Sequence, residues 1–308
     1  MRRVTTDLPN VDMPPLVVSI VINYRGLDQT RVCVASLVAA DYPNHSILVV
    51  DNASGGLEVE ALREALGDSV EIIGAERNLG YGGGANLGLE WAHRSGAVYA
   101  WVLNNDTEVD PRSVRQLVEV MERETDYGIL SPQINSPISP EAPNGVWYAG
   151  GTISLARANT THQFVPASTS ADVEPTEFVT GCAMFLRLQA LDGTGTFWEP
   201  LFLYWEDADL SLRMGRAGWR LGVVPAASIF HFVHGSIQSK TFRYYTSRNA
   251  ILVAKRHLGS RAAARAAIWV AARSLKSWAL RGGPIPIVEA RGLVAGLAMT
   301  VRMSRLVP

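Results

Sequence analysis

The sequence predicts an α/β fold with a Rossmann-like, mostly parallel central sheet flanked by helices. Apolar, β-branched runs alternate with segments of helical periodicity through the first half of the chain, and only short links separate them. Several of the apolar runs also end in polar side chains, as strands do at the ligand-binding edge of an open sheet. Strands and helices that alternate in this way form parallel sheets with right-handed crossovers.

The predicted elements follow from the same periodicities. The expected strands are the short apolar runs at 16–23, 46–50, 70–74, 98–103, 128–132, 183–187, 220–224 and 227–230. The expected helices are the periodic stretches at 28–40, 58–66, 83–95, 112–124 and 207–216. Pro, Ser, Thr, Asn and Gly are frequent over 135–175, so we expect a long irregular segment there, and such segments are usually functional.

Charge is distributed unevenly along the 308 residues, although the net charge is only −1. From Lys255 onward there are ten Lys or Arg residues and a single acid, Glu289, so the rest of the chain is acidic. A basic tail favours an anionic partner. Residues 261–278 are typical of a basic amphipathic helix that either lies on a bilayer or packs on the body through its apolar face.

We expect three parts along the chain, which are a flexible lead-in over 1–15, a main domain over 16–254 and a basic helical extension over 255–308. The main domain divides into halves of about 16–132 and 133–254.

Composition argues against several classes of protein. Residues 1–15 lack the apolar core of a signal peptide, and no apolar run of about 20 residues is present to cross a membrane. We therefore expect a cytoplasmic protein, either free or peripheral at the inner face of the plasma membrane. Cys33 and Cys182 have apolar neighbours and no CxxC spacing, which indicates buried hydrophobes rather than ligands or a disulfide. The acidic body argues against nucleic acid.

Polar side chains follow the first two predicted strands. Asn23 and Tyr24 end the first strand, and Asp51 ends the second. An aromatic ring and a carboxylate at adjacent strand ends can hold a nucleobase by stacking and by accepting a ring N–H. Asx residues at such positions also start turns, so both interpretations stay open.

A glycine-rich segment, NLGYGGGANLG at 78–88, leads from the third predicted strand into the third predicted helix. Glycines let backbone N–H groups approach a ligand, and a helix N-terminus favours an anion, so a diphosphate could bind nearby. No Lys-Ser/Thr pair follows the glycines, which excludes a Walker loop. A tight turn with close helix packing is the alternative.

Asn104, Asn105 and Asp106 follow the fourth predicted strand. Magnesium keeps several waters and often takes one or two carboxylates plus substrate phosphates, so Asp106 with diphosphate oxygens could hold it. The alternative is a helix cap, a role that Asp110 ahead of Pro111 fits better.

A second acidic cluster comprises Glu206, Asp207 and Asp209, directly after Trp205. Like charges this close raise one another's pKa unless a cation or donor offsets them, which indicates a functional site. One of the three acids could instead complement a helix dipole. His231 follows a later strand and is either a core residue or a metal ligand.

Several segments carry a family resemblance and occur in order from about residue 16 to 256. They are VSIVINY at 18–24, DYPNHSILVVDNAS at 41–54, NLGYGGGANLG at 78–88, LNNDTEVDP at 103–111, VTGCAMFLR at 179–187, LFLYWEDADLSLRMGRAGWRL at 201–221 and His231. The set resembles the family 2 inverting glycosyltransferases of GT-A fold, in their bacterial rhamnosyltransferase-like branch.

The resemblance implies a divalent metal, Mg or Mn, held by Asp106 and His231. It implies that Asp207 is the catalytic base, and that Trp205, Glu206 and Asp209 face the acceptor. The implied donor-binding residues are Asn23, Tyr24, Asp51, Asn78, Gly80, Gly82, Gly83, Asn86, Asn104, Asn105 and Asp106. Asn104 departs from the family pattern, because many relatives carry an acid there in an Asp-X-Asp motif.

The implied reaction is a single displacement from a dTDP- or UDP-sugar, with dTDP-L-rhamnose favoured by the resemblance. The acceptor would be a hydroxyl of a glycan, a lipid-linked sugar or a small molecule, in cell-wall, polysaccharide or natural-product biosynthesis. Two alternatives stay open: a UDP-sugar-dependent transferase of the same fold, and a nucleotide-sugar-binding protein without catalysis.

Overall fold

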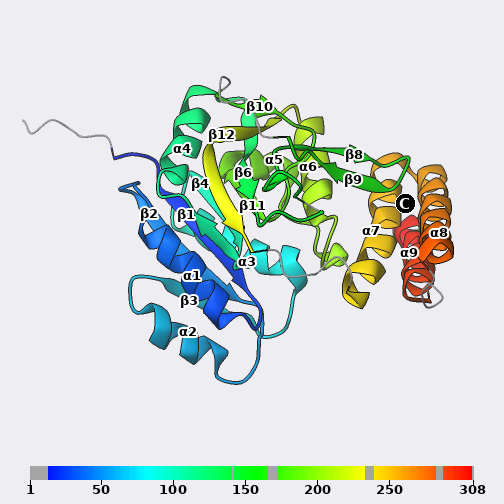
Figure 1. Ribbon diagram of the computed structural model, residues 1–308, viewed down its shortest axis with the longest axis horizontal. Helices are drawn as coiled ribbons and strands as arrows, with labels where there is room; N and C mark the ends of the chain where they lie inside the picture. Colours follow the sequence, from blue (N-terminus) through cyan, green and yellow to red (C-terminus); the bar gives the residue numbers. More distant parts are fainter. Residues whose placement is uncertain (1–12, 141, 166–171, 233–238, 282–286, 307–308) are drawn as a thin grey trace, which may run out of the picture.

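A computed structural model describes residues 13–140, 142–165, 172–232, 239–281 and 287–306 (Figure 1). Most of the lead-in expected at 1–15 therefore lies outside the described residues. The strands are β1 Val17–Asn23, β2 His45–Asp51, β3 Glu71–Gly74, β4 Tyr99–Asn104, β5 Thr107–Val109, β6 Tyr127–Asn135, β7 Val146–Tyr148, β8 Gly151–Ser154, β9 Asn159–His162, β10 Glu174–Pro175, β11 Ala183–Arg187 and β12 Arg220–His231.

The helices alternate with the strands in the first half and gather at the C-terminus. They are α1 Leu27–Val38, α2 Glu58–Leu66, α3 Gly80–Arg94, α4 Ser113–Arg123, α5 Leu188–Thr194, α6 Glu206–Arg216, α7 Lys240–Leu258, α8 Ser260–Arg281 and α9 Ile287–Leu306, with a 3₁₀ turn, η1, at Glu199–Leu201.

The central sheet is parallel in its first half and mixed in its second. Its order is β10-β12-β6-β11-β4-β1-β2-β3, with β5 on β12 and β7 on β6. The strands β3, β2, β1 and β4 are parallel, as predicted, whereas β11 runs antiparallel to both β4 and β6. The parallel register sets Asn23 beside Asp51 and Ile22 beside Asn104. The polar ends of three strands therefore meet at one edge of the sheet.

Two expectations about the second half were wrong. The segment 135–175 is not irregular throughout, because it contains β7, β10 and a separate two-stranded sheet, β8–β9. These strands are only two to four residues long, which is too short to show a period in the sequence. The strands predicted at 220–224 and 227–230 are one strand, β12, with a register shift between Val224 and Ser228.

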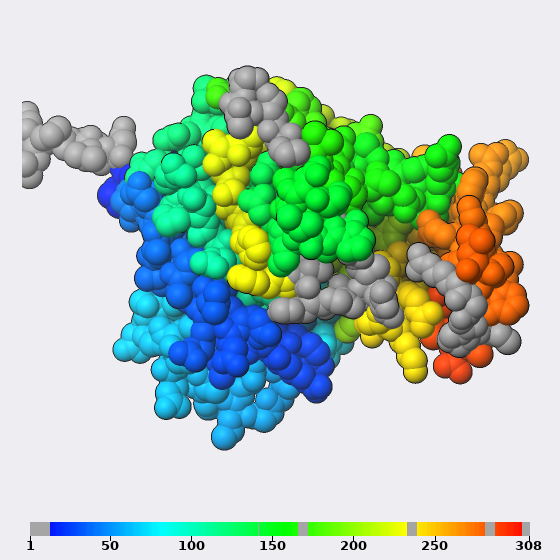
Figure 2. Space-filling model, viewed as in Figure 1, coloured from blue at the N-terminus to red at the C-terminus, as the bar shows by residue number. Residues whose placement is uncertain are grey.

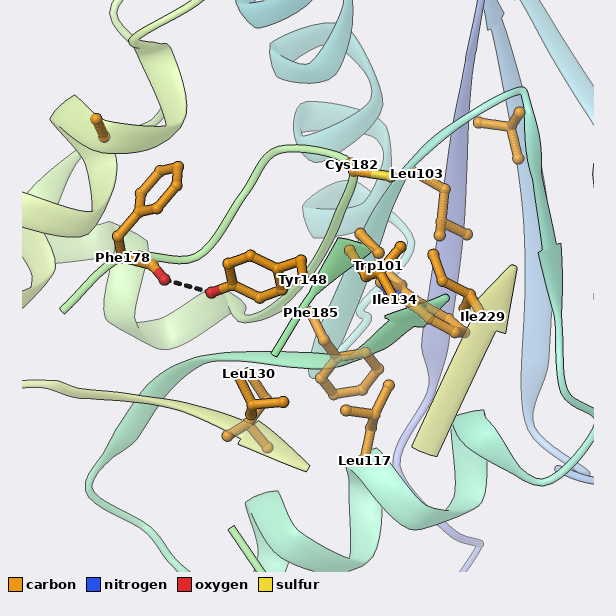
Figure 3. Close-up of a cluster of buried hydrophobic side chains, with 14 of the residues drawn as sticks. Trp101, Leu103, Leu117, Leu130, Ile134, Tyr148, Phe178, Cys182, Phe185 and Ile229 are labelled. Carbon is orange, nitrogen blue, oxygen red and sulfur yellow. Dashed lines mark hydrogen bonds between the residues drawn. The ribbon is translucent and has the colours of Figure 1, made fainter. Parts of the chain in front are cut away.

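The core lies on both faces of the sheet. One large cluster centres on Trp101, Phe185 and Leu130, with Leu117 of α4 packed against them (Figure 3). Tyr148 of β7 extends into this cluster and donates its hydroxyl to the carbonyl oxygen of Phe178. Because apolar area removed from water stabilises a fold by about 25 cal/mol per Å², these large side chains fix the strands whose ends carry the polar groups.

The C-terminal helices α7, α8 and α9 form a group at one end of the molecule, opposite α2 (Figures 1 and 2). None of the helices in the described ranges is long and apolar enough to cross a membrane. The domain boundary expected between residues 254 and 255 falls inside α7.

Candidate active site

A hydrogen-bonded cluster joins the ends of β1 and β2. The side chains of Asn23 and Asp51 are buried, and Asn23 Nδ2 donates to Asp51 Oδ1 over 2.8 Å. The backbone N–H of Ser54 donates to Asp51 Oδ2 over 3.1 Å, and its hydroxyl also contacts this carboxylate. Tyr24 lies beyond the cluster with 44% of its surface exposed. Asp51 is therefore held in place, while Tyr24 stays partly exposed with the Arg25 guanidinium over one face of its ring, 5.1 Å from the centroid.

The glycine-rich segment is the start of a helix rather than a loop. Helix α3 begins at Gly80, and Asn78 Oδ1 accepts the Gly80 N–H over 2.8 Å. A Cβ atom built on Gly88 would lie 2.3 Å from Ile20, and one on Gly80 would lie 2.1 Å from the carbonyl oxygen of Phe202. Close packing of α3 thus requires these glycines, which is the alternative that the sequence left open.

Gly82, Gly83 and Asn86 were also expected to bind the sugar donor, but they contact protein atoms instead. Cβ atoms added at Gly82 and Gly83 would meet Phe197 and Leu79. Asn86 Nδ2 donates to the carbonyl oxygen of Phe197 over 3.0 Å. These contacts favour a packing role for the segment, while Tyr81 within it reaches the pocket described next.

A pocket of about 480 Å³ lies where β4, β12 and α6 converge. Its polar walls bring together residues from distant parts of the sequence. They include Tyr81, Asn104, Asp106, Thr160, His162, Thr180, Trp205, Glu206, Asp207 and His231. Asn105, by contrast, is not part of the lining, because its side-chain amide donates to Gly26 O and Thr30 Oγ1. Asn105 therefore fixes the loop after β1.

Asp106 and His231 form a pair in this pocket. Strand β5, directly after Asp106, pairs with the end of β12, where Thr107 is opposite His231. His231 Nε2 lies 3.2 Å from Asp106 Oδ1. Burial opposes a charge on the imidazole, but Cys182 and Asp106 raise the pKa of His231 above its usual range. Since burial raises the pKa of the Cys182 thiol, Asp106 is the anion that matters.

Asp106 and His231 could supply two ligands to a divalent metal ion. No cluster of three or more His, Cys, Asp or Glu ligands occurs within the described ranges. Two protein ligands nevertheless fit an ion that takes its other ligands from phosphates and water. The His231 Nδ1 atom is buried without a hydrogen-bond partner in the part of the chain that is described, so this imidazole is incompletely satisfied.

Asp207 and Glu206 present two carboxylates at the start of α6. Asp207 is half-buried, and its oxygens accept the N–H groups of Gly181 over 3.0 Å and Ala208 over 2.8 Å. Burial raises the pKa of Asp207, although these hydrogen bonds oppose the shift. Burial, together with the Asp207 charge, raises the pKa of Glu206 well above its usual range. Glu206 Oε2 has no hydrogen-bond partner among the described residues, and it lines the pocket.

Helix α7 holds the turn that delivers these carboxylates. Phe202, Tyr204 and Trp205 have positive φ angles of 65°, 66° and 74°, which are unfavourable for non-glycine residues. Asn249 is fully buried, and its Nδ2 donates to the carbonyl oxygens of Leu201, Leu203 and Tyr204 over 2.9, 2.8 and 2.7 Å. These contacts compensate for the strained backbone and fix the entry into α6.

Asp209 does not face the pocket, contrary to its expected position on the acceptor side. Its carboxylate is fully buried, and it contacts Arg213 Nε over 2.9 Å and His257 Nε2 over 2.9 Å, with Arg256 Nε at 3.5 Å. Burial favours the neutral acid, but the contacts with His257, Arg213 and Arg256 lower the pKa of Asp209 overall. Asp209 thus joins α6 to the end of α7.

Comparison with known proteins decides the family. Residues 19–171 match the sequence pattern of Glycosyl transferase family 2, and residues 101–286 match that of Glycosyl transferase family group 2. The second match spans more than half of the chain. The chain belongs to the family 2 glycosyl transferases. The resemblance inferred from the ordered motifs is thereby confirmed.

Individual relatives agree with this family assignment. The glycosyltransferase is 28% identical over 214 residues to N-acetylglucosaminyl-diphospho-decaprenol L-rhamnosyltransferase of Mycobacterium tuberculosis, across 64% of this chain and 69% of the relative. GalNAc-T7, solved with UDP, GalNAc and Mn²⁺, gives a TM-score of 0.65 at 15% identity over 79% of this chain and 48% of that chain.

A third similarity involves an archaeal structure. Mannosyltransferase PcManGT from Pyrobaculum calidifontis, in complex with GDP-Man and Mn²⁺, gives a TM-score of 0.56 at 15% identity over 93% of this chain and 87% of that chain. These structures confirm the GT-A fold. The chain spans only about half of the GalNAc-T7 chain that it matches.

Sequence reasoning missed several pocket residues of this glycosyltransferase. Trp147 of β7 and His162 of β9 line the pocket, with ring centroids 4.6 Å apart, and Trp147 lies 4.7 Å from His231. Tyr204 and Phe242 also line it. The isolated aromatics of the segment 135–175 were the available signal, but nothing local shows which of them reach the pocket.

Proposed function

We propose that the chain is an inverting glycosyltransferase that moves a sugar from a nucleoside diphosphate donor to an acceptor hydroxyl. The observation that carries the proposal is the convergence of Asp106, His231 and Asp207 on one pocket. This pocket adjoins the sheet edge where β1, β2 and β4 end in polar residues. One acidic group for a cation and another for a proton are what the displacement requires.

In the proposed reaction Asp207 accepts the proton of the acceptor hydroxyl while that oxygen attacks the anomeric carbon. The bond from this carbon to the diphosphate oxygen breaks, and the nucleoside diphosphate leaves with the electron pair. Attack from the face opposite the leaving group inverts the anomeric centre. The raised pKa of Asp207 makes it a stronger base than an ordinary aspartate, which supports this role.

Other pocket residues would orient the reactants. Glu206 Oε2, which is buried without a partner among the described residues, would be satisfied by an acceptor hydroxyl. Asp106 and His231 would hold a divalent metal, Mg or Mn, which would neutralise the charge on the diphosphate. Asp51 and Tyr24 would hold the base of the donor by hydrogen bonding and stacking. Asn104, which lines the pocket next to Asp106, would contact the donor sugar or its diphosphate.

For the donor we propose dTDP-L-rhamnose, on the strength of the rhamnosyltransferase relative. A UDP-sugar is the alternative, and the similarity to GalNAc-T7 with UDP favours it. The name of the mycobacterial relative also supports a lipid-linked acceptor, a sugar on a polyprenyl diphosphate. Such an acceptor would bring the protein to the cytoplasmic face of the membrane, where we propose that the basic C-terminal helices make peripheral contact.

The first experiment measures release of nucleoside diphosphate from a panel of dTDP-, UDP- and GDP-sugars, with Mg or Mn and then with a chelator. We expect slow hydrolysis of one donor and its loss with chelator. Release that survives the chelator would contradict the metal proposal. Absence of both release and donor binding across the panel would contradict the transferase. Binding without turnover, even with acceptors, would instead identify a non-catalytic nucleotide-sugar-binding protein.

A further inference from the structure

A second hollow lies behind the candidate active site, between the β8–β9 hairpin and helix α8. Its volume is about 490 Å³, and its walls include Arg157 of the hairpin turn together with Trp269, Arg273 and Lys276 of α8. No acidic residue is found among the described residues that line it. In the ribbon the hairpin extends toward the C-terminal helices (Figure 1).

Of the three basic side chains in this hollow, Arg273 is hydrogen-bonded to the protein, whereas Arg157 and Lys276 could bind a ligand. Arg273 Nη1 and Nη2 donate to the carbonyl oxygen of Ala158 over 3.2 and 3.1 Å, which ties the hairpin turn to α8. The exposed side chains of Arg157 and Lys276 form no ion pair or side-chain hydrogen bond within the described part of the chain. The hollow thus combines a fixed wall with two uncompensated positive charges.

The outer face of α8, beyond the hollow, also carries basic side chains, and exposed apolar side chains lie among them. Ala263, Ala266 and Val270 are buried and mark the inner face of the helix. The opposite face, by helical spacing, carries Arg261, Arg265, Ile268 and Leu275, and Trp269 and Lys276 lie beside it, on the side that lines the hollow. Ile268, Trp269 and Leu275 are 68%, 50% and 55% exposed. Exposed apolar and aromatic side chains among basic ones are typical of a surface that lies at the headgroup level of a bilayer.

We propose that the hollow between β8–β9 and α8 binds the phosphate of an anionic membrane lipid, with the outer face of α8 on the bilayer. The charge of the site selects this occupant, because two uncompensated cations and the basic tail attract anionic headgroups. The exposed apolar residues favour a lipid surface over a soluble anion. This inference deepens the peripheral contact suggested with the proposed function, since it names the site and the ligand chemistry.

The test is co-sedimentation with vesicles of phosphatidylcholine, with and without phosphatidylglycerol, using the full chain. We expect the wild type to bind only the anionic vesicles. Each basic residue near such a surface contributes about 1 kcal/mol, so the double variant Arg157→Ala, Lys276→Ala should bind about 30-fold more weakly. The matched control removes two cations at the far end of the molecule, with Arg31→Ala and Arg63→Ala, and should bind like the wild type.

Each other outcome overturns the proposal. Equal weakening in both double variants would mean that diffuse charge attracts the membrane, and unchanged binding in the Arg157/Lys276 variant would remove the site. Binding of inorganic diphosphate without any binding of vesicles would identify a soluble anion as the ligand. Donor hydrolysis is measured on the same variants and should be unchanged. Failure of the transferase proposal would therefore appear as absent hydrolysis in every variant, whatever the vesicles do.

Discussion

Replacing Asn249 by Ala should disturb the candidate active site from a distance. Asn249 is fully buried on α7, and its amide donates to three carbonyl oxygens of the turn that leads into Glu206 and Asp207. The two N–H groups of the amide share these three acceptors, and Asn249 Oδ1 also accepts Arg248 Nε over 2.7 Å, so the variant loses about three hydrogen bonds. A buried hydrogen bond contributes about 1 kcal/mol net, so the free energy of unfolding should fall by about 3 kcal/mol. With an unfolding entropy of about 2 cal/mol/K per residue, this change corresponds to a Tm lower by about 5 °C.

The functional effect should exceed the effect on stability. Without Asn249, the strained residues Phe202, Tyr204 and Trp205 can relax toward ordinary backbone angles, and Asp207 moves with them. Displacement of a reacting group by about 1 Å can cost about 100-fold in rate, so we expect kcat to fall about 10- to 100-fold at a temperature where the variant is folded.

The assay pairs thermal unfolding with kcat per folded enzyme. The control is Asn44→Ala, which removes one hydrogen bond of 2.7 Å, to Pro14 O, far from the pocket. We expect the control to lower Tm by about 1 to 2 °C and to leave kcat unchanged. A variant of Asn249 that loses the expected stability yet keeps wild-type kcat would refute the idea that α7 positions the catalytic turn.

Three further predictions concern the acidic residues of α6. Asp207→Asn should lower transfer by about 10²- to 10⁴-fold while donor binding persists, and retention of more than about a tenth of the rate would count against a general base. The same variant should be at least as stable as the wild type at neutral pH, because a raised folded pKa means that the charged form opposes folding there, and calorimetry checks this. Asp209 should behave in the opposite way, because folding lowers its pKa and its ionised carboxylate therefore stabilises the fold. This stabilisation is present above the unfolded pKa of about 4 and is lost as the pH falls through the folded pKa. Denaturant titrations from neutral to acid pH should show a shallower loss of stability in Asp209→Asn than in the wild type, and parallel curves would exclude this linkage.

The parallel half of the fold was predictable because its signals are local. Alternating strands and helices fix the crossovers, and the crossovers bring Asn23, Asp51 and Asn104 to one edge. Asp207 and His231 were singled out by residue type and by family resemblance, and both line the pocket.

The predictions from sequence were wrong where contacts between residues distant in the sequence determine the structure. Asp209 is turned away from the pocket by its contacts with Arg213 and with Arg256 and His257, and the last two are nearly fifty residues away in the sequence. The glycines at 80–88 indicate a close approach, but the sequence does not say whether the neighbour is a phosphate or the side chain of Ile20. Of the short strands of 135–175, β7 and β10 are held by pairing with β6 and β12, and β8 and β9 by pairing with each other, rather than by their own periodicity.

The attachment of α7 to the turn that leads into Glu206 and Asp207 has a practical consequence for protein engineering. A chimera or truncation that exchanges the C-terminal helices at residue 254 would cut α7 and remove Arg256 and His257, two of the partners of Asp209. Such a protein would lose activity for reasons unrelated to membranes. A junction after Leu258, where α7 ends, keeps both partners, and grafted helices would then have to cover the face of α7 on which α9 packs through Gly292 and Gly296.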